Sequence, residues 1–301
     1  MRRYLIWSVA AIMPALAAAL IIGFTGCGGG TKPDDDDDVA STKPKGKSGG
    51  STQTPVEGAY TGTLNGKVTF VGDKPPIADL TAKLQDAMKA KDEAHCLASG
   101  ASEEEKSQQT WLISPDGRLG NVFVWIVPPK GKFFKVDMNN KTWEDRVELK
   151  QPHCAFIKHC FVLFPEYYDE TAKKKVPTGQ QFVVTNTSPM NHNTKIEGGF
   201  NEILPSGKEL AVESLTSKSM PISIACDIHT WMNAYAGVFD HPYATVTKPD
   251  GTYEIKNVPV GADVRIIAWH EKARFLNSGG GNGEEIKLEA KSTKDFTAKV
   301  K

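Results

Sequence analysis

The chain has 301 residues, of which 36 are basic and 36 acidic, so its formal net charge is zero. Balanced charge gives no general attraction to nucleic acid, and we expect no nucleic-acid partner. A hydrophobic fraction of 40%, with 27 glycines and 18 prolines, is typical of a soluble, turn-rich globular body. The length suffices for two domains of ordinary size.

The N-terminus has the pattern of a targeting segment. Two arginines precede an apolar run over residues 5–24, which ends in Phe-Thr-Gly-Cys27. This ending resembles the lipobox of bacterial lipoproteins, which implies that residues 1–26 are a signal peptide and that Cys27 is lipidated. The alternative is an uncleaved anchor helix, because the run is long enough to span a bilayer although Pro14 interrupts it. Both interpretations export the chain and hold it at a membrane of the cell envelope, on the periplasmic or another extracytoplasmic side.

Residues 27–57 form a predicted disordered tether. The segment contains a glycine run, the acidic run Asp34–Asp38 and almost no large apolar residue, so it cannot build a core. Five adjacent aspartates on such a segment are more typical of a solvated spacer than of a calcium site.

The remaining chain predicts a mainly β fold with one helical insertion. Leu80, Leu84 and Met88 recur at helical spacing, which predicts a helical insertion over residues 78–94. Short apolar or alternating runs bounded by turn residues indicate β-sandwiches. The predicted strands cover residues 66–71, 121–127, 180–186, 220–226, 234–239, 253–255, 264–269 and 285–288.

The segment CDIHTWM carries the most specific chemical signal. Cys226, His229 and Met232 follow one another at intervals of three residues and offer a thiolate, an imidazole and a thioether. These soft ligands favour copper, whereas the thioether argues against zinc. A distant histidine must complete such a site, and His192 is the candidate; Met190 is a second, poorer axial candidate.

The strand before this segment explains how the thiolate is placed. Ile222, Ile224 and Cys226 lie on one face of a strand, and the apolar face is the buried one. Cys226 is therefore expected at the rim of a core, and the loop that follows presents the other two ligands.

Residues 145–240 resemble a cupredoxin domain, a Greek-key β-sandwich of the plastocyanin and amicyanin type. The resemblance is carried by the strand 177–186, by Met-Asn-His-Asn193, and by the Cys-x-x-His-x-x-Met spacing of the short amicyanin loop. It implies a single type 1 copper ion held by His192, Cys226, His229 and the weak axial ligand Met232. It also implies that Asn193 braces the loop of Cys226 from the second shell of ligands.

A wider resemblance covers the flanking regions. Short motifs along the chain, among them Asn121-Val-Phe-Val124, Cys154-Ala-Phe156 and Asp240-His-Pro-Tyr243, are similar to those of cupredoxin-like envelope proteins of methylamine utilisation. Residues 244–271 resemble the second half of a carboxypeptidase regulatory-like or transthyretin-like sandwich. We therefore expect residues 58–144 and 241–301 to form a second, small β-sandwich into which the cupredoxin domain is inserted. Two consecutive domains, or one enlarged sandwich, are the alternatives.

Three further cysteines remain, namely Cys96, Cys154 and Cys160. In an oxidising compartment two of the three are expected to form a disulfide, and the resemblance implies the pair Cys96 and Cys154. Cys160 is then free or paired between molecules. Each of these cysteines follows a histidine, but the spacing of the three His-Cys pairs fits no standard second metal site.

His241 and His270 are expected to be structural or surface residues. The dipeptide His270-Glu271 can also be interpreted as an acid/base site, but an interface role between the sandwiches fits better.

These observations predict an exported electron carrier rather than an enzyme. Redox protein partners would dock transiently around His229, which is expected at the edge of the site, on an apolar surface that includes Met190 and Trp231. The first alternative is a non-redox copper carrier or a structural envelope lipoprotein that binds protein or glycan. The second is a copper oxidoreductase, which would need additional copper centres.

Overall fold

The computed structural model describes residues 53–300, which belong to one compact unit, residues 50–301. The predicted fold class is confirmed, because the described chain is mainly β with several sheets. The predicted signal peptide, Cys27 and most of the predicted tether lie outside the described residues. Within residues 53–300, no helix combines the length and apolarity needed to cross a bilayer.

The predicted tether is too long at its C-terminal end. Strand β1 (Thr54–Pro55) pairs in parallel with β4 (Lys132–Phe133), and Val56 is buried in a hydrophobic core. Burial of Val56 ties this short segment to the folded body, so residues 53–57 are not part of a disordered spacer.

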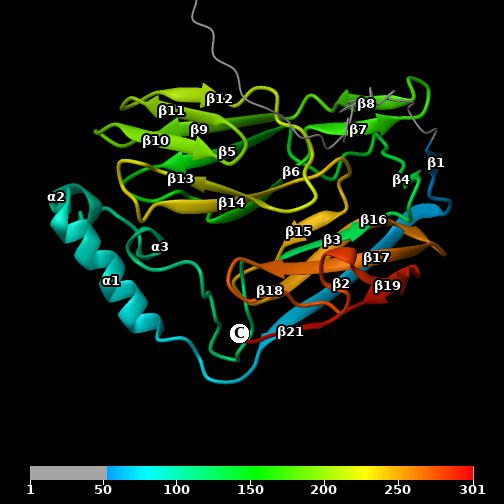
Figure 1. The fold of residues 1–301 in the computed structure, drawn as a ribbon, viewed down its shortest axis with the longest axis horizontal. Helices are drawn as coiled ribbons and strands as arrows, with labels where there is room; N and C mark the ends of the chain where they lie inside the picture. Colours follow the sequence, from blue (N-terminus) through cyan, green and yellow to red (C-terminus); the bar gives the residue numbers. More distant parts are fainter. Residues whose placement is uncertain (1–52, 301) are drawn as a thin grey trace, which may run out of the picture. The chain divides into compact units, whose positions relative to one another are not determined.

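One β-sandwich is built from the two flanking regions of the sequence. Strands before residue 134 and after residue 243 pair with one another, and their two sheets enclose a common core (Figure 1). One sheet contains β15 (Ala244–Val246), β3 (Phe123–Val127), β17 (Asp263–His270), β18 (Arg274–Phe275) and β19 (Glu284–Lys287). The other contains β16 (Thr252–Val260), β2 (Ala59–Phe70), β20 (Lys291–Thr293) and β21 (Phe296–Ala298).

A second sandwich is built from the middle of the chain, which pairs only with itself. Its larger sheet has the order β11 (Phe200–Leu204), β10 (His192–Ile196), β13 (Ile222–Ala225), β14 (Asn233–Val238) and β6 (Cys160–Leu163). The facing sheet has the order β12 (Glu209–Ala211), β9 (Gln181–Asn186) and β5 (Arg146–Gln151). A separate hairpin joins β7 (Glu166–Asp169) to β8 (Lys174–Pro177).

The two sandwiches share a third core, because their central strands are apolar on both faces. In β3, Val124 and Ile126 face the core of the flanking sandwich, while Phe123 and Trp125 belong to the shared core. β14 divides in the same way, since its alanines pack into the middle sandwich and Tyr235 packs into the shared core. Alternation along a strand sends successive side chains to opposite faces, so these strands must be covered on both sides.

The helices lie between β2 and β3 in the sequence. The predicted helix over residues 78–94 is two helices, α1 (Ile77–Ala90) and α2 (Glu93–Cys96), because the chain turns at Asp92. Asp92 has a left-handed backbone with φ 61° and ψ 35°, which a helix interior does not allow. A short helix α3 (Glu103–Lys106) and a 3-10 turn (Gly280–Asn282) were not predicted. Met88 of α1 is buried in the core of the middle sandwich.

Each predicted strand corresponds to an observed one, with boundaries shifted by a few residues. The strands that were missed are short or partly exposed: β1, β4, β5, β6, β7, β8, β10, β11, β12, β15, β18, β20 and β21. A strand of two to five residues is too short to show a clear apolar period, so its pairing partners define it. The six residues of β5 are the exception, because Val147 and Leu149 alternate with more exposed neighbours.

His270 and Glu271 take structural positions, and Glu271 lies at the junction of the two sandwiches. The carboxylate of Glu271 lies 2.6 Å from Nε2 of His159, which belongs to the middle sandwich, and both side chains are buried. Nε2 of His270 lies 2.8 Å from the carbonyl oxygen of Thr110 and is buried as well. Glu271 thus has the expected interface role, whereas the hydrogen bond of His270 stays within the flanking region.

His241 is a buried aromatic member of the same junction. Its ring stacks with Phe239 and Tyr243, and its Nδ1 accepts a hydrogen bond of 3.2 Å from the backbone N–H of Tyr243. Burial lowers the pKa of His241 from 6.5 to about 4, although Asp240 opposes this shift. The native protein therefore holds this imidazole neutral.

We predict that His241 makes the protein less stable in mild acid. The unfolded chain takes up a proton on this histidine below pH 6.5, whereas the folded chain does so only near pH 4. The free energy of unfolding should thus fall by up to roughly 3 kcal/mol as the pH drops through this window. Asparagine offers a neutral acceptor that takes up no proton. In urea titrations at several pH values, the free energy of unfolding of His241→Asn should therefore fall less steeply as the pH drops. Identical pH profiles for the two proteins would contradict this account.

Candidate metal centre

The ligand loop, residues 226–232, connects β13 to β14. The two strands pair in antiparallel register up to Ala225 and Asn233, so the ends of the loop are held side by side. The N–H of Cys226 donates to the carbonyl of Met232 at 3.2 Å, and the N–H of Met232 donates to that of His229 at 2.8 Å. A loop closed by its own backbone bonds gives its side chains few alternative positions.

Three of the predicted ligands converge in a buried cluster. Ligand atoms of His192, Cys226 and His229 all lie within 4.8 Å of one another. The two Nδ1 atoms of the histidines face each other at 3.1 Å. His192 is the first residue of β10, two strands along the same sheet from β14, so the sheet itself brings the distant histidine to the loop.

The sulfur of Cys226 lies in surroundings that favour the thiolate. Burial alone raises the pKa of this thiol, but hydrogen bonds from His192 and His229 outweigh burial and lower the pKa to about 5. The backbone N–H groups of Asn193 and His229 each donate to the sulfur at 3.4 Å. These surroundings favour the thiolate, which is the form that binds metal.

Asn193 joins β10 to the ligand loop. Its Oδ1 accepts a hydrogen bond of 2.9 Å from the backbone N–H of Asp227, directly after the cysteine. Its Nδ2 donates to Oδ1 of Asn201 at 2.6 Å, which fixes the orientation of the amide. The side chain therefore holds the strand of one histidine against the loop of the cysteine.

Met232 is buried in the same core as Cys226, at the end of the ligand loop. Met190 and Trp231 are half-buried and pack against this core. The indole N–H of Trp231 donates to the carbonyl of Cys154 at 3.1 Å, so this side chain is tied to the neighbouring segment.

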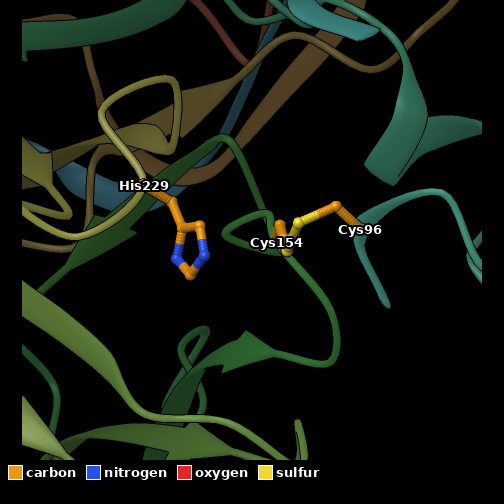
Figure 2. A group of neighbouring side chains, drawn as sticks. All are labelled: Cys96, Cys154 and His229. Atoms are coloured by element: carbon orange, nitrogen blue, oxygen red, sulfur yellow. A yellow bond between two sulfur atoms is a disulfide. The ribbon is translucent and has the colours of Figure 1, made fainter. Parts of the chain in front are cut away.

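A disulfide joins Cys96 of α2 to Cys154, and Cys160 is a free, buried cysteine. Figure 2 shows this disulfide beside the imidazole of His229. Ligand atoms of Cys96, Cys154 and His229 lie within 4.8 Å of one another, but the two sulfurs are bonded to each other rather than free to bind an ion. Within residues 53–300, this group and that of His192, Cys226 and His229 are the two places where three potential ligands meet.

The expectation that His229 forms an exposed edge of the site is wrong. Its side chain is only 1% exposed, because the turn between α1 and α2 covers it. Oδ2 of Asp92 lies 3.0 Å from Nε2 of His229. Burial lowers the pKa of His229, but Cys226 and Asp92 together raise it above its ordinary value.

Asp92 was not predicted from the sequence as a residue of the site. It lies 137 positions before His229 and inside a segment with helical periodicity, so no local pattern marks it.

The donor set suits copper: two imidazole nitrogens and a thiolate converge in a dry site, with a thioether side chain buried in the same core.

No protein-family model and no curated protein matches this chain. The interpretation of the centre therefore depends on its geometry and its donor atoms.

We predict that the disulfide contributes several kcal/mol to stability. It closes a loop over a sequence separation of 58 residues, which corresponds to about 4 kcal/mol of lost entropy in the unfolded chain. The double variant Cys96→Ala and Cys154→Ala should lower the free energy of unfolding in urea by about 2–4 kcal/mol. Cys160→Ala is the control, because it removes the sulfur of a buried cysteine that forms no disulfide. Equal stability of the double variant and the native protein would contradict the prediction.

Proposed function

We propose that the protein is an exported, membrane-tethered type 1 copper protein that transfers single electrons. One observation carries the proposal: the sulfur of Cys226 and the Nδ1 atoms of His192 and His229 meet in one buried cluster. Bound copper would cycle between Cu(I) and Cu(II) and so carry one electron. Met232 is the proposed axial ligand, as the cupredoxin resemblance implies.

The surrounding residues fit the demands of such a carrier. The closed ligand loop, Asn193 and the N–H donors to the sulfur hold the thiolate and the imidazoles in place before any ion arrives. A preorganised donor set needs little rearrangement when its charge changes, and burial keeps water from the thiolate. The proposed function is therefore that of an electron relay.

Two features support export to the cell envelope. The lipobox-like sequence at Cys27 would tether the protein to a membrane by a lipid, and a disulfide joins Cys96 to Cys154. Disulfides of this kind persist in oxidising compartments. The proposed partners are redox proteins that dock transiently near Met190 and Trp231.

A non-redox copper carrier is the second candidate, because the same donors bind Cu(I) tightly without any need for turnover. Reversible reduction and reoxidation of the bound ion would favour the electron carrier. Transfer of the ion to an acceptor chelator or protein would favour the alternative. A copper oxidoreductase ranks third and would require more than one copper ion per chain.

We predict that the full-length protein binds one copper ion per chain and develops an intense blue thiolate-to-copper absorption band. Cys226→Ser should abolish the band, because the serine hydroxyl is not a thiolate donor. Cys160→Ser, at a second buried free cysteine of the described residues, should leave the band unchanged. A colourless native protein with full copper occupancy would refute the proposed centre, and the measurements are visible absorption and metal analysis.

A further inference from the structure

The turn between α1 and α2 contacts the ligand loop at two successive positions. The ammonium group of Lys91 donates a hydrogen bond to the carbonyl of Ile228, and the carboxylate of Asp92 lies 3.0 Å from Nε2 of His229. The segment that carries these residues, Ile77–Cys96, lies between two strands of the flanking sandwich in the sequence. A part of the chain outside the middle sandwich thus covers the outer side of a proposed ligand.

The disulfide fixes this turn to the middle sandwich. Cys96 ends α2, four residues after Asp92, and is bonded to Cys154. Cys154 in turn accepts the hydrogen bond from the indole of Trp231, within the ligand loop. Figure 2 shows the disulfide and His229 next to each other. The position of Asp92 is therefore set by a covalent link close to the imidazole and not by a free loop.

The two proposed imidazole ligands differ in their outer nitrogens. Among the described residues, Nε2 of His192 is buried without a hydrogen-bond partner, whereas Nε2 of His229 has Asp92. The side chain of Asp92 is 37% exposed and that of His229 is 1% exposed. The carboxylate consequently stands between the imidazole and solvent.

We propose that Asp92 is a positioning residue of the centre, acting through His229. This inference rests on the copper site proposed above. By accepting the hydrogen on Nε2 of the neutral imidazole, Asp92 opposes the hydrogen bond that Nδ1 would otherwise donate to Cys226, and so it keeps Nδ1 available to a metal. A carboxylate at the outer nitrogen also makes an imidazole a stronger donor to a metal. Stronger donation stabilises Cu(II) relative to Cu(I), so Asp92 lowers the midpoint potential.

The backbone at Asp92 allows a clean test. Its left-handed conformation is one that glycine adopts without strain, so Asp92→Gly removes the carboxylate and preserves the turn. Asp92→Asn removes the charge but keeps a carbonyl oxygen that accepts a hydrogen bond. Glu93→Gln removes the same charge from the adjacent, exposed residue and is the matched control.

The first measurement uses the metal-free protein. Nitrogen-15 NMR of His229, at a pH where the imidazole is neutral, should show one tautomer with hydrogen on Nε2 in the native protein, in Asp92→Asn and in Glu93→Gln. Asp92→Gly should show a mixture of tautomers, because the thiolate of Cys226 then competes for the hydrogen at Nδ1. A single Nε2–H tautomer in Asp92→Gly would overturn the positioning role.

The second measurement uses the copper-loaded protein. Asp92→Gly and Asp92→Asn should raise the midpoint potential by clearly more than Glu93→Gln, since only Asp92 contacts the ligand. Equal shifts in the three variants would overturn the effect on potential. A native protein that binds no copper would refute the proposed function itself, while the tautomers of the metal-free protein would still decide whether Asp92 positions His229.

Discussion

Burial of two sheets on both faces is the constraint on which the rest of the structure depends. Phe123 and Trp125 of β3 must be covered by the middle sandwich, and Tyr235 of β14 must be covered by the flanking one. A sheet that buries apolar side chains on both faces removes more apolar surface from water than a sheet covered on one face, and is stabilised more. The shared core therefore fixes β14, and through its pairing with β13 it fixes the ends of the ligand loop.

The proposed centre combines this rigid support with contacts from three separate parts of the chain. β10 supplies His192 and the brace Asn193, the ligand loop supplies the thiolate and His229, and the turn at Asp92 meets His229 from outside. Each contact satisfies a polar group in a region that excludes water, where an unpaired group would be costly. The same bonds that stabilise the fold thus orient the donor atoms.

Local patterns predicted the parts of the site that depend on neighbours in sequence. Alternation placed Cys226 on the buried face after Ile222 and Ile224, which the structure bears out. The break at Asp92 and the burial of His229 were not predictable, because both follow from packing between segments far apart in the chain. Periodicity described α1 correctly but gave no reason to end the helix before residue 94. Short strands such as β7 and β12 were missed because partners, and not their own residues, define them.

The covering turn has a consequence for how the protein can be divided. A fragment spanning residues 145–240 would contain all four proposed ligands, yet it would lack Asp92 and would leave Cys154 without its disulfide partner. The residues that form and support the proposed centre therefore extend beyond the sandwich that supplies its ligands. Transplanting this centre into another scaffold would require both the middle sandwich and the helical segment Ile77–Cys96.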